Sequence, residues 1–335
     1  MFGAARKMAA AGVLGLNKRN SELIMRFNPR RFYPTVDNKE LTKRLAMEAG
    51  MAVPDLYGVV HNQGEVRNLA QIVAHHDSFV IKPAHGSGGD GIVVVAARSK
   101  RKRDSFRLAS GLLVSYDDLK HHTSNVVGGQ YSLSGNPDVA MIEYCVQFDP
   151  LFNDVSFQGV PDIRVIVYRG YPIMAMVRLP TRSSDGKANL HQGAVGAGID
   201  MQTGRTLAGV LKNGVVDEHP DTGALIGGLQ IPDWDFILQS SARALEVTGL
   251  GYVGVDIVID RQLGPLILEM NARPGLNIQI ANRAGIWHRI ETIDRLFNSD
   301  DDAERRAAIA REQFPGQRPT TLPPADRAPA VQAEA

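Results

Sequence analysis

Short apolar runs alternate with polar and glycine-rich stretches along most of the chain. Runs rich in Val, Ile and Leu and bounded by turn residues are typical of β-strands. Several follow each other closely, which favours antiparallel neighbours over the strand–helix alternation of a doubly wound parallel sheet. No internal repeat is visible, and we predict a mixed α/β (α+β) fold. The predicted strands are Leu56–Val60, Phe79–Lys82, Ile92–Ala96, Val139–Val146, Asp162–Arg169, Tyr171–Leu179, Tyr252–Asp260 and Pro265–Asn271.

Capping residues and apolar spacing predict three helices. The first begins after Asp37, a plausible N-cap. The second covers Trp234–Thr248. Ser299, followed three residues later by Asp302, is a capping-box signature for a last helix that ends near Gln313.

The segments between these elements differ in character. Residues 1–36 form a lead-in segment, in which an apolar run at Met8–Leu16 follows two basic residues and faintly resembles a signal peptide. It lacks a clear cleavage site, so we expect a short helix that packs on the body. Residues 98–138 resemble a polar excursion, and 182–198 are predicted to form a loop. The Pro/Ala-rich residues 315–335 are predicted to be a disordered tail.

Composition excludes several classes of protein. The 335 residues are 44% hydrophobic and 22% charged, as in globular proteins, and the net charge of +1 gives no general attraction to nucleic acid. The single cysteine, Cys145, cannot form an internal disulfide. No apolar stretch is long enough to span a membrane. The lone cysteine and the lack of a clear export signal favour the cytoplasm.

A glycine-rich loop, Gly86–Gly91, follows the predicted strand that ends in Lys82. Glycines let backbone N–H groups approach an anion closely, and a lysine adds positive charge for phosphate. The loop leads into a strand and not a helix, so it is neither a Walker A loop nor a dinucleotide-binding fingerprint. A tight hairpin turn without ligand explains the glycines equally well. Lys82, however, ends an apolar strand, where it needs an anionic partner.

Carboxylates lie within two apolar strands near the C-terminus. Asp256 is in the middle of one strand, and Glu269 and Asn271 share a face of the next because side chains alternate along a strand. Such hard oxygen donors suit Mg²⁺. The alternative is a structural ion pair with Arg273 or Arg283.

Together these pieces resemble the ATP-grasp superfamily, and specifically the RimK-like α-L-glutamate ligases and their relatives, over roughly residues 37–280. The matching stretches follow the family's order. They are Asp37-Asn38-Lys39 through Gly50 with Val53-Pro54, Lys82-Pro83 with the glycine loop, Asp162-Ile163-Arg164, Arg178 with Asn189-Leu190-His191-Gln192-Gly193, and Gly254-Val255-Asp256-Ile257 with Gly264-Pro265 through Glu269, Asn271 and Pro274-Gly275-Leu276.

The resemblance implies that ATP and Mg²⁺ are bound at matching positions. The implied nucleotide and metal residues are Lys39 and Lys82 at the α- and β-phosphates, Gly86, Ser87, Gly88, Gly89 and Gly91 over the triphosphate, Glu143, Tyr144, Cys145 and Val146 along the adenine, and Asp256, Glu269 and Asn271 around two Mg²⁺ ions, which Mn²⁺ can replace.

The resemblance also implies catalytic roles. Arg178 stabilises an acyl phosphate, while Arg164 and Asn189 help to place substrate or phosphate. His191 is a weaker candidate, because a lone histidine beside a loop is more often structural. The family's ribose-binding acid has no clear match: Gln147 and Asp149 lie nearest to its place, so the role stays unassigned.

The implied fold is the ATP-grasp fold, in which two α+β lobes with antiparallel-rich sheets clamp ATP. We predict an ATP-grasp domain over residues 37–314, with a smaller ATP-clamping lobe at about 55–146 and a larger lobe with the metal site at about 147–314. The domain that usually precedes this fold is expected to be truncated, since only residues 1–36 come before it.

The implied activity is an ADP-forming carboxylate–amine ligase that works through an acyl phosphate and adds glutamate or another amino acid to a peptide or protein. The alternatives are an ATP-grasp kinase that phosphorylates a hydroxyl and an ATP-binding module without catalysis. The expected partners are an amino acid and a peptide or protein acceptor, with no nucleic acid, no membrane span and a homo-oligomer as an option.

Two further features stay open. The basic residues at 100–103 are either a solvated loop or a guide for an acidic peptide substrate. The pairs His75-His76 and His121-His122 suggest a metal site. Adjacent residues on a strand point in opposite directions, which argues against that interpretation.

Overall fold

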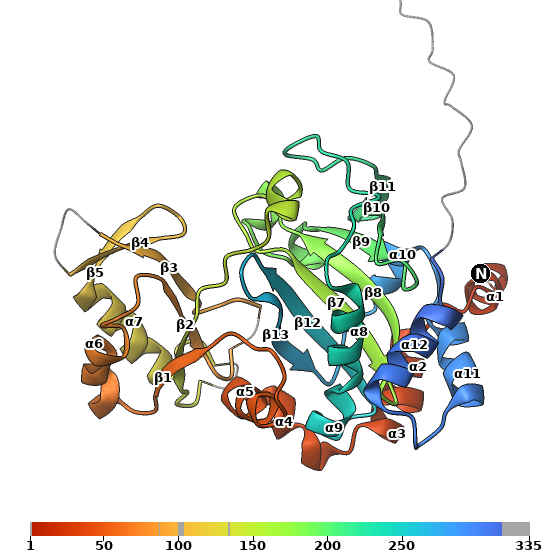
Figure 1. Ribbon diagram of the computed structural model, residues 1–335, viewed down its shortest axis with the longest axis horizontal. Helices are drawn as coiled ribbons and strands as arrows, with labels where there is room; N and C mark the ends of the chain where they lie inside the picture. Colours follow the sequence, from red (N-terminus) through yellow and green to blue (C-terminus); the bar gives the residue numbers. More distant parts are fainter. Residues whose placement is uncertain (1, 87, 100–103, 133–134, 317–335) are drawn as a thin grey trace, which may run out of the picture.

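Two antiparallel sheets, one in each of two lobes, form the framework of the protein (Figure 1). The computed structural model describes residues 2–86, 88–99, 104–132 and 135–316. Every pairing between its named strands is antiparallel within these ranges. The basic residues at 100–103 and the tail beyond residue 316 lie outside the described residues.

The small lobe has one sheet with helices on one face. In spatial order its strands are β1 (Leu56–Val60), β6 (Ala140–Glu143), β2 (Phe79–Pro83), β3 (Val93–Arg98), β4 (Ser105–Leu108) and β5 (Leu113–Ser115). The covering helices are the 3₁₀ helix Gln63–Asn68, α6 (Leu69–Ile72) and α7 (Tyr116–Val127). The expected excursion at 98–138 is therefore largely ordered structure, since it supplies β4, β5 and α7.

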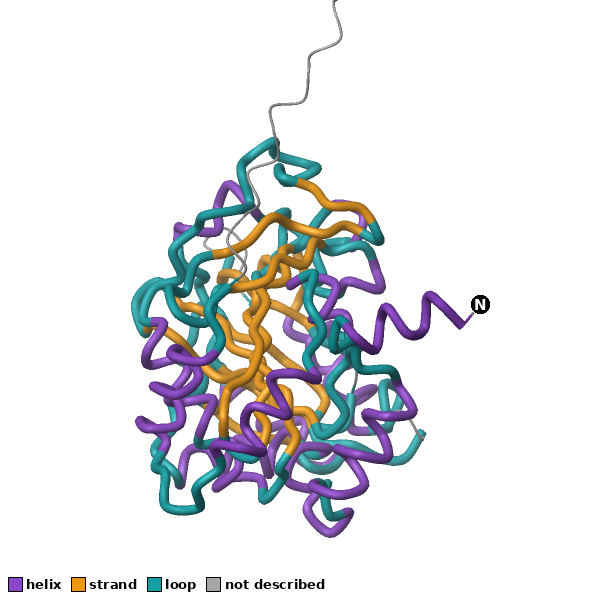
Figure 2. Tube along the Cα trace, turned by 90° about the vertical axis from the view of Figure 1, so that its right-hand side faces the viewer, coloured by secondary structure: helices purple, strands orange, loops and turns teal. Residues whose placement is uncertain are grey.

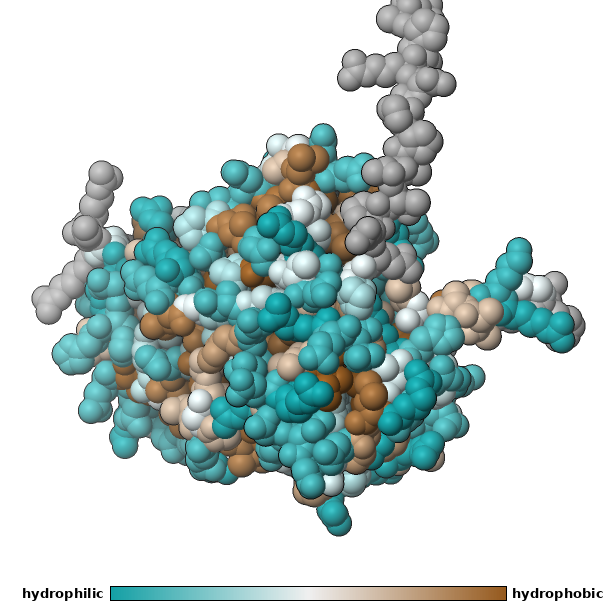
Figure 3. Space-filling model, turned by 45° about the vertical axis from the view of Figure 1, so that its right-hand side comes forward, coloured by the Kyte–Doolittle hydropathy of each residue, from teal (hydrophilic) through white to brown (hydrophobic). Residues whose placement is uncertain are grey.

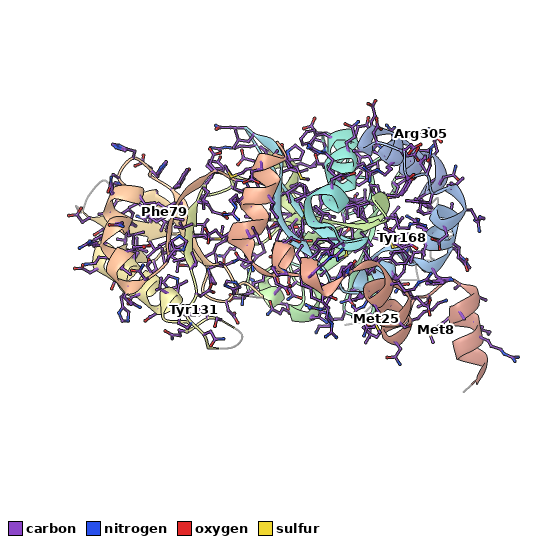
Figure 4. The ribbon with its side chains drawn as sticks, turned by 90° about the horizontal axis from the view of Figure 1, so that it is seen from below. Met8, Met25, Phe79, Tyr131, Tyr168 and Arg305 are labelled. Carbon is purple, nitrogen blue, oxygen red and sulfur yellow. The ribbon has the colours of Figure 1, made fainter. Side chains whose placement is uncertain are left out.

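Alternation along β2 and β6 divides the small lobe into an apolar and a polar side. Phe79, Ile81 and Ile142 belong to the hydrophobic core under α7. Lys82 and Glu143 alternate with them and so point to the opposite side. Figure 4 shows Phe79 within this lobe.

The large lobe contains a longer sheet and most of the helices. Its strands, in spatial order, are β11 (Gly214–Val216), β10 (Thr206–Leu211), β9 (Val195–Ile199), β8 (Tyr171–Leu179), β7 (Asp162–Tyr168), β12 (Tyr252–Asp260) and β13 (Gly264–Asn271). Its helices are α8 (Trp234–Ala242), α9 (Ala244–Thr248), α10 (Asn277–Asn282), α11 (Trp287–Leu296) and α12 (Ala303–Gln313), with short 3₁₀ turns at Pro150–Val155, Arg182–Ser184 and Leu190–Gln192. Figure 2 shows the strands inside a shell of helices.

The first part of the chain runs from a projecting helix to the junction between the lobes. Its elements are α1 (Phe2–Ala10), α2 (Leu16–Lys18), a π-helical stretch (Arg19–Ile24), α3 (Met25–Phe27), a 3₁₀ turn (Arg30–Phe32), α4 (Pro34–Asp37) and α5 (Lys39–Glu48). Figure 1 places α5 between the lobes, where it contacts β13 and α9.

The predicted helix at the N-terminus forms, but the expectation that it packs on the body is wrong. Gly3 and Arg6–Ala10, the residues of α1 whose side-chain burial is described, are all exposed. Figures 2 and 3 show the helix projecting away from the large lobe.

Two predicted N-caps are wrong by one to three positions. Asn38, and not Asp37, caps α5, because its side chain accepts from the backbone N–H of Leu41. Asp302, and not Ser299, caps the last helix by accepting from Arg305 N–H. In each case the side chain nearer to the helix satisfies the free N–H group.

Two predicted segments differ in extent. The helix predicted over Trp234–Thr248 is interrupted at Arg243, whose guanidinium donates to the carbonyl of Ala49. The loop predicted at 182–198 ends early, because its last residues begin β9.

No helix in the described part of the chain is long and apolar enough to cross a membrane.

Asn28 joins the N-terminal segment to the large sheet. Its buried amide donates to the carbonyls of Tyr252 and Ala272 at 2.7 and 2.9 Å and accepts from Tyr252 N–H at 2.9 Å. Each bond satisfies a backbone group that is shielded from water.

Replacing Asn28 with alanine is therefore expected to lower the free energy of unfolding by about 2–4 kcal/mol, since it leaves buried polar groups unpaired. Urea unfolding measures this change. Asn17→Ala, at an exposed position in α2, is the control and should change stability by less than about 0.5 kcal/mol. Equal stability of the two variants would contradict the assigned role of Asn28.

Candidate active site

A cleft of about 1000 Å³ lies between the lobes and collects most of the predicted site residues. The glycine loop and Lys82 line it from the small lobe, and β7, β8, β12 and β13 line it from the large lobe. Its charged and histidine residues are Asp37, Lys39, Lys82, His85, Asp90, Asp162, Arg164, Arg178, Lys187, His191, Asp256, Glu269 and Arg273.

Strand pairing places a row of ion pairs on the floor of the cleft. Asp256 of β12 is opposite Arg164 of β7, and Asp162 of β7 is opposite Arg178 of β8. Arg164 donates to both oxygens of Asp256, at 2.7 Å from Nε and 2.5 Å from Nη2. Arg178 donates to Asp256 at 2.9 Å and also pairs with Asp162. Two carboxylates thus share two guanidinium groups.

The two carboxylates respond differently to this environment. Burial alone would raise the pKa of Asp256, but Arg164 and Arg178 outweigh it and lower the pKa to about 2. For Asp162, burial dominates over the attraction of Arg178, and the pKa rises to about 6. The pKa of Arg178 is raised, because the two carboxylates outweigh the effect of its own burial. Asp256 therefore stays ionised between two fixed cations.

The predicted metal ligands come together at one edge of this row. Glu269 is directly opposite Asp256, and Asn271 lies two residues further along β13 and also lines the cleft. The Glu269 side chain is 39% exposed, with its carboxylate 4.0 Å from the ammonium group of Lys39. Glu269 and Asn271 thus offer oxygen donors from β13 that fit a hard cation such as Mg²⁺, whereas both oxygens of Asp256 accept from Arg164 and Arg178.

Two further observations concern these candidate metal ligands. Within the described residues, no group of three or more His, Cys, Asp and Glu side chains is arranged to hold a metal, so phosphate or water oxygens would have to complete a shell. The alternative ion pair with Arg273 or Arg283 is wrong for Asp256, because its partners are Arg164 and Arg178.

The glycine loop is a hairpin between β2 and β3 with an unusual backbone. Gly88, Gly89 and Gly91 have φ values of +66°, +84° and +75°, which side-chain-bearing residues rarely adopt. A Cβ at Gly91 would lie 2.5 Å from the ring of Tyr131, a small-lobe residue labelled in Figure 4. The Lys39 ammonium donates to the carbonyl of Gly86 at 2.5 Å. Ser87, predicted to contact the triphosphate, lies outside the described residues.

Lys82 finds the anionic partner that its position requires inside the protein. Its ammonium pairs with the buried carboxylate of Glu143, which also lies 2.5 Å from the ammonium of Lys43. Burial opposes ionisation of Glu143, but the two lysines lower its pKa. Burial lowers the pKa of Lys43 to about 8, although Glu143 acts in the opposite direction. Lys43 is a member of this cluster that the sequence did not indicate.

The predicted adenine segment links the two lobes. Tyr144 donates from its hydroxyl to Asp260 at 3.0 Å, and the backbone N–H of Gln147 donates to the same oxygen at 2.8 Å. Cys145 is buried, and Val146 is half-buried. Asp260 was not predicted, although it lies four residues after Asp256 and thus on the same face of β12.

Asn189 and His191 lie in the loop before β9, where nearby Lys187 pairs with Asp90 of the glycine loop at 3.9 Å. The Asn189 side chain accepts from the backbone N–H of His191 at 3.0 Å. His191 Nε2 lies 3.4 Å from the amide nitrogen of Asn277. Both residues line the cleft, but these contacts fold the loop and do not by themselves assign a chemical role.

His85, at the beginning of the glycine loop, was not predicted as a site residue. Its Nδ1 lies 2.7 Å from a carboxylate oxygen of Asp138, a side chain with no solvent exposure. The two residues are 53 positions apart, so no local pattern could reveal the pair.

The comparison with protein families identifies the chain as a member of the ATP-grasp superfamily. The sequence model of the family described as "Sugar-transfer associated ATP-grasp" matches residues 18–295. No curated protein matches the chain.

Solved structures show weaker likeness. The ATP-grasp ligase PsnB with its minimal precursor is 16% identical over 79% of this chain and 60% of its own, with a TM-score of 0.43. D-cycloserine synthetase DcsG is 14% identical over 85% and 72%, with a TM-score of 0.41. D-alanine–D-alanine ligase from Bacillus anthracis is 12% identical over 84% and 68%, with a TM-score of 0.43. The chain thus spans 60% of the length of the PsnB chain.

The ion-pair row predicts that removing a buried carboxylate lowers stability much more than removing an exposed one. Asp256→Ala leaves two buried guanidinium groups with one carboxylate and is expected to cost about 3–5 kcal/mol of stability. Asp235→Ala removes an exposed partner of Arg311 and should cost less than about 1 kcal/mol. Urea unfolding of both variants measures the contrast, and similar losses would show that the row does not stabilise the large lobe.

Proposed function

The chain belongs to the sugar-transfer-associated ATP-grasp family, and we propose that it is an ATP-dependent, ADP-forming carboxylate–amine ligase. The observation that supports this activity most is the row of Arg164, Asp256 and Arg178 in the cleft that the glycine loop also lines. It puts two fixed guanidinium groups in a cleft that also carries accessible oxygen donors for a metal. We further propose glutamate or another amino acid as one substrate, a peptide or protein as the other, a RimK-like relationship and a cytoplasmic location.

ATP is proposed to lie between the lobes. Lys39 and Lys82 would contact the α- and β-phosphates and the glycine loop would cover the triphosphate, while Glu143 to Val146 would follow the adenine. Lys82 shares Glu143 with Lys43, so Lys43 can keep this carboxylate neutralised when Lys82 contacts phosphate. Asp256, Glu269 and Asn271 would hold two Mg²⁺ ions, or Mn²⁺, which when bound neutralise phosphate charge.

The chemistry explains why the cleft needs these cations. A substrate carboxylate must approach the γ-phosphate, and two like unit charges 4 Å apart repel by about 4 kcal/mol at an effective dielectric constant of 20. Arg178 and Arg164 are held in place by Asp162 and Asp256 and need no rearrangement to present their charge. Such preorganised charge is the main contribution of proteins to phosphoryl transfer.

The proposed reaction has two steps. A carboxylate oxygen attacks the γ-phosphorus, the bond to ADP breaks, and an acyl phosphate forms beside Arg178. An amine nitrogen then attacks the acyl carbon, and inorganic phosphate leaves. Asn189, from the loop before β9, is proposed to help Arg164 place the substrate.

A substrate panel tests the proposal directly. The protein, ATP and Mg²⁺ are mixed with amino acids and short acidic peptides, and phosphate release is measured with mass spectrometry of each mixture. We expect phosphate release together with a product heavier by one amino-acid residue. Formation of ADP and a phosphorylated product without free phosphate would contradict the ligase proposal and indicate a kinase. A stabilisation by ATP and Mg²⁺ without any turnover on the panel would favour the binding module.

Glu269→Ala tests the metal assignment with little expected effect on stability. Glu269 is 39% exposed and makes only a 4.0 Å ion pair with Lys39 among the described residues, so its loss should leave the melting temperature nearly unchanged. We expect phosphate release to fall at least about 100-fold, because charge stabilisation of the transition state is lost. Glu48→Ala, on the exposed face of α5, should keep full activity. Normal turnover by Glu269→Ala would refute the assignment.

A further inference from the structure

His85 and the buried Asp138 form a fixed pair at the edge of the cleft. Asp138 Oδ1 accepts from Nδ1 of the His85 ring at 2.7 Å and from the backbone N–H of Val139 at 2.7 Å. Both carboxylate oxygens also lie within 3.2 Å of the backbone nitrogen of His85. The carboxylate has no solvent exposure, whereas the His85 side chain is 45% exposed and lines the cleft. A buried acceptor at Nδ1 keeps the proton there and leaves Nε2 with its lone pair.

Nε2 of His85 has no hydrogen-bond partner among the residues that the structure describes, which separates it from the other histidines near the cleft. His122 uses both ring nitrogens, with Nε2 3.0 Å from the carbonyl of Gly91 and Nδ1 3.5 Å from Tyr131. His191 Nε2 faces the amide of Asn277 at 3.4 Å. His122 therefore holds the far end of the glycine loop, while His85 offers a nitrogen to the cleft.

The carboxylates that line the cleft are already matched with cations. Within the described residues, each lies within 4.0 Å of a lysine or arginine. The pairs are Asp37 with Arg273, Asp90 with Lys187, Glu269 with Lys39, Asp162 with Arg178, and Asp256 with Arg164 and Arg178. The remaining cation, Lys82, is bound to Glu143. His85 is thus the cleft residue best placed to accept a proton.

We propose that His85, oriented by Asp138, is the general base for the acceptor amine. The inference rests on the proposed ligase function and adds to it, since an amine that enters as an ammonium ion cannot attack. Nε2 takes one proton from the ammonium nitrogen, whose lone pair then forms the C–N bond. The C–O bond to phosphate breaks, and the inorganic phosphate that leaves takes the second proton, which the nitrogen loses as the amide forms. His85 is a catalytic residue in this step, and Asp138 is its positioning residue.

His85→Asn separates catalysis from anchoring of the loop. The asparagine amide nitrogen can replace Nδ1 as donor to Asp138, but no nitrogen remains at the place of Nε2. The assay uses ATP, Mg²⁺ and the panel substrates that support turnover, once with the amine substrate and once with hydroxylamine. Hydroxylamine is uncharged near neutral pH and traps the acyl phosphate without a base.

We expect conjugate formation by His85→Asn at pH 7 to fall about 10²–10³-fold, in the range of general-base catalysis, with hydroxamate formation within twofold of wild type. The defect should shrink as pH rises, because the amine then loses its proton to solvent. His122→Ala is the control for a loosened loop. It should raise KM for ATP and slow both products by the same factor, without a change in pH profile.

Four results would overturn the proposal. Unchanged conjugate formation by His85→Asn would show that no base is needed there. Equal losses of conjugate and hydroxamate, as expected for His122→Ala, would show that His85 only holds the glycine loop in place. A wild-type chain that forms neither product on the panel would refute the ligase function, and the base with it. Hydroxamate without conjugate in wild type would keep the ligase activation step but remove the amine step assigned to His85.

Discussion

The arrangement of the large lobe around the cleft depends on one carboxylate, Asp256, held between Arg164 and Arg178. Removing charges from water is costly, and close pairing with good geometry is what makes such burial tolerable. Because the partners come from β12, β7 and β8, the ion pairs require these strands to be neighbours in this register. The same constraint fixes the position of both guanidinium groups before any ligand arrives, while Asp162 and Asp256 balance their charge.

In the small lobe, side chains that alternate along β2 and β6 separate the apolar core from a buried ion pair. Apolar side chains of β2 and β6 face α7, and the residues between them, Lys82 and Glu143, are left to neutralise each other on the other side. Lys43 joins them from α5, which lies between the lobes and also carries Lys39. One short helix therefore couples the glycine loop, through Lys39 and Gly86, to the edge of the large sheet near Glu269.

Much of the architecture could be predicted from the sequence, because it rests on local patterns. β1, β8 and β12 have the bounds that their apolar runs predicted, and the ATP-grasp fold follows from motifs in the right order. Errors arose where two neighbouring residues could serve equally, as with Asn38 at the cap of α5. The assigned roles of the site residues stay predictions, since no ligand contact tests them.

Contacts between distant segments could not be predicted. Asp138 meets His85 across 53 positions, and Asp260 holds Tyr144 across 116. The charge balance of the cleft is another property of the folded chain. In the described residues its lining carries six lysines and arginines against five carboxylates, a net charge of only +1. Most of its cations are already neutralised by protein anions, whereas a triphosphate and a substrate carboxylate together bring several negative charges. Divalent cations would have to supply the difference, so the ion pairs in the cleft are themselves a physical reason to expect metal dependence.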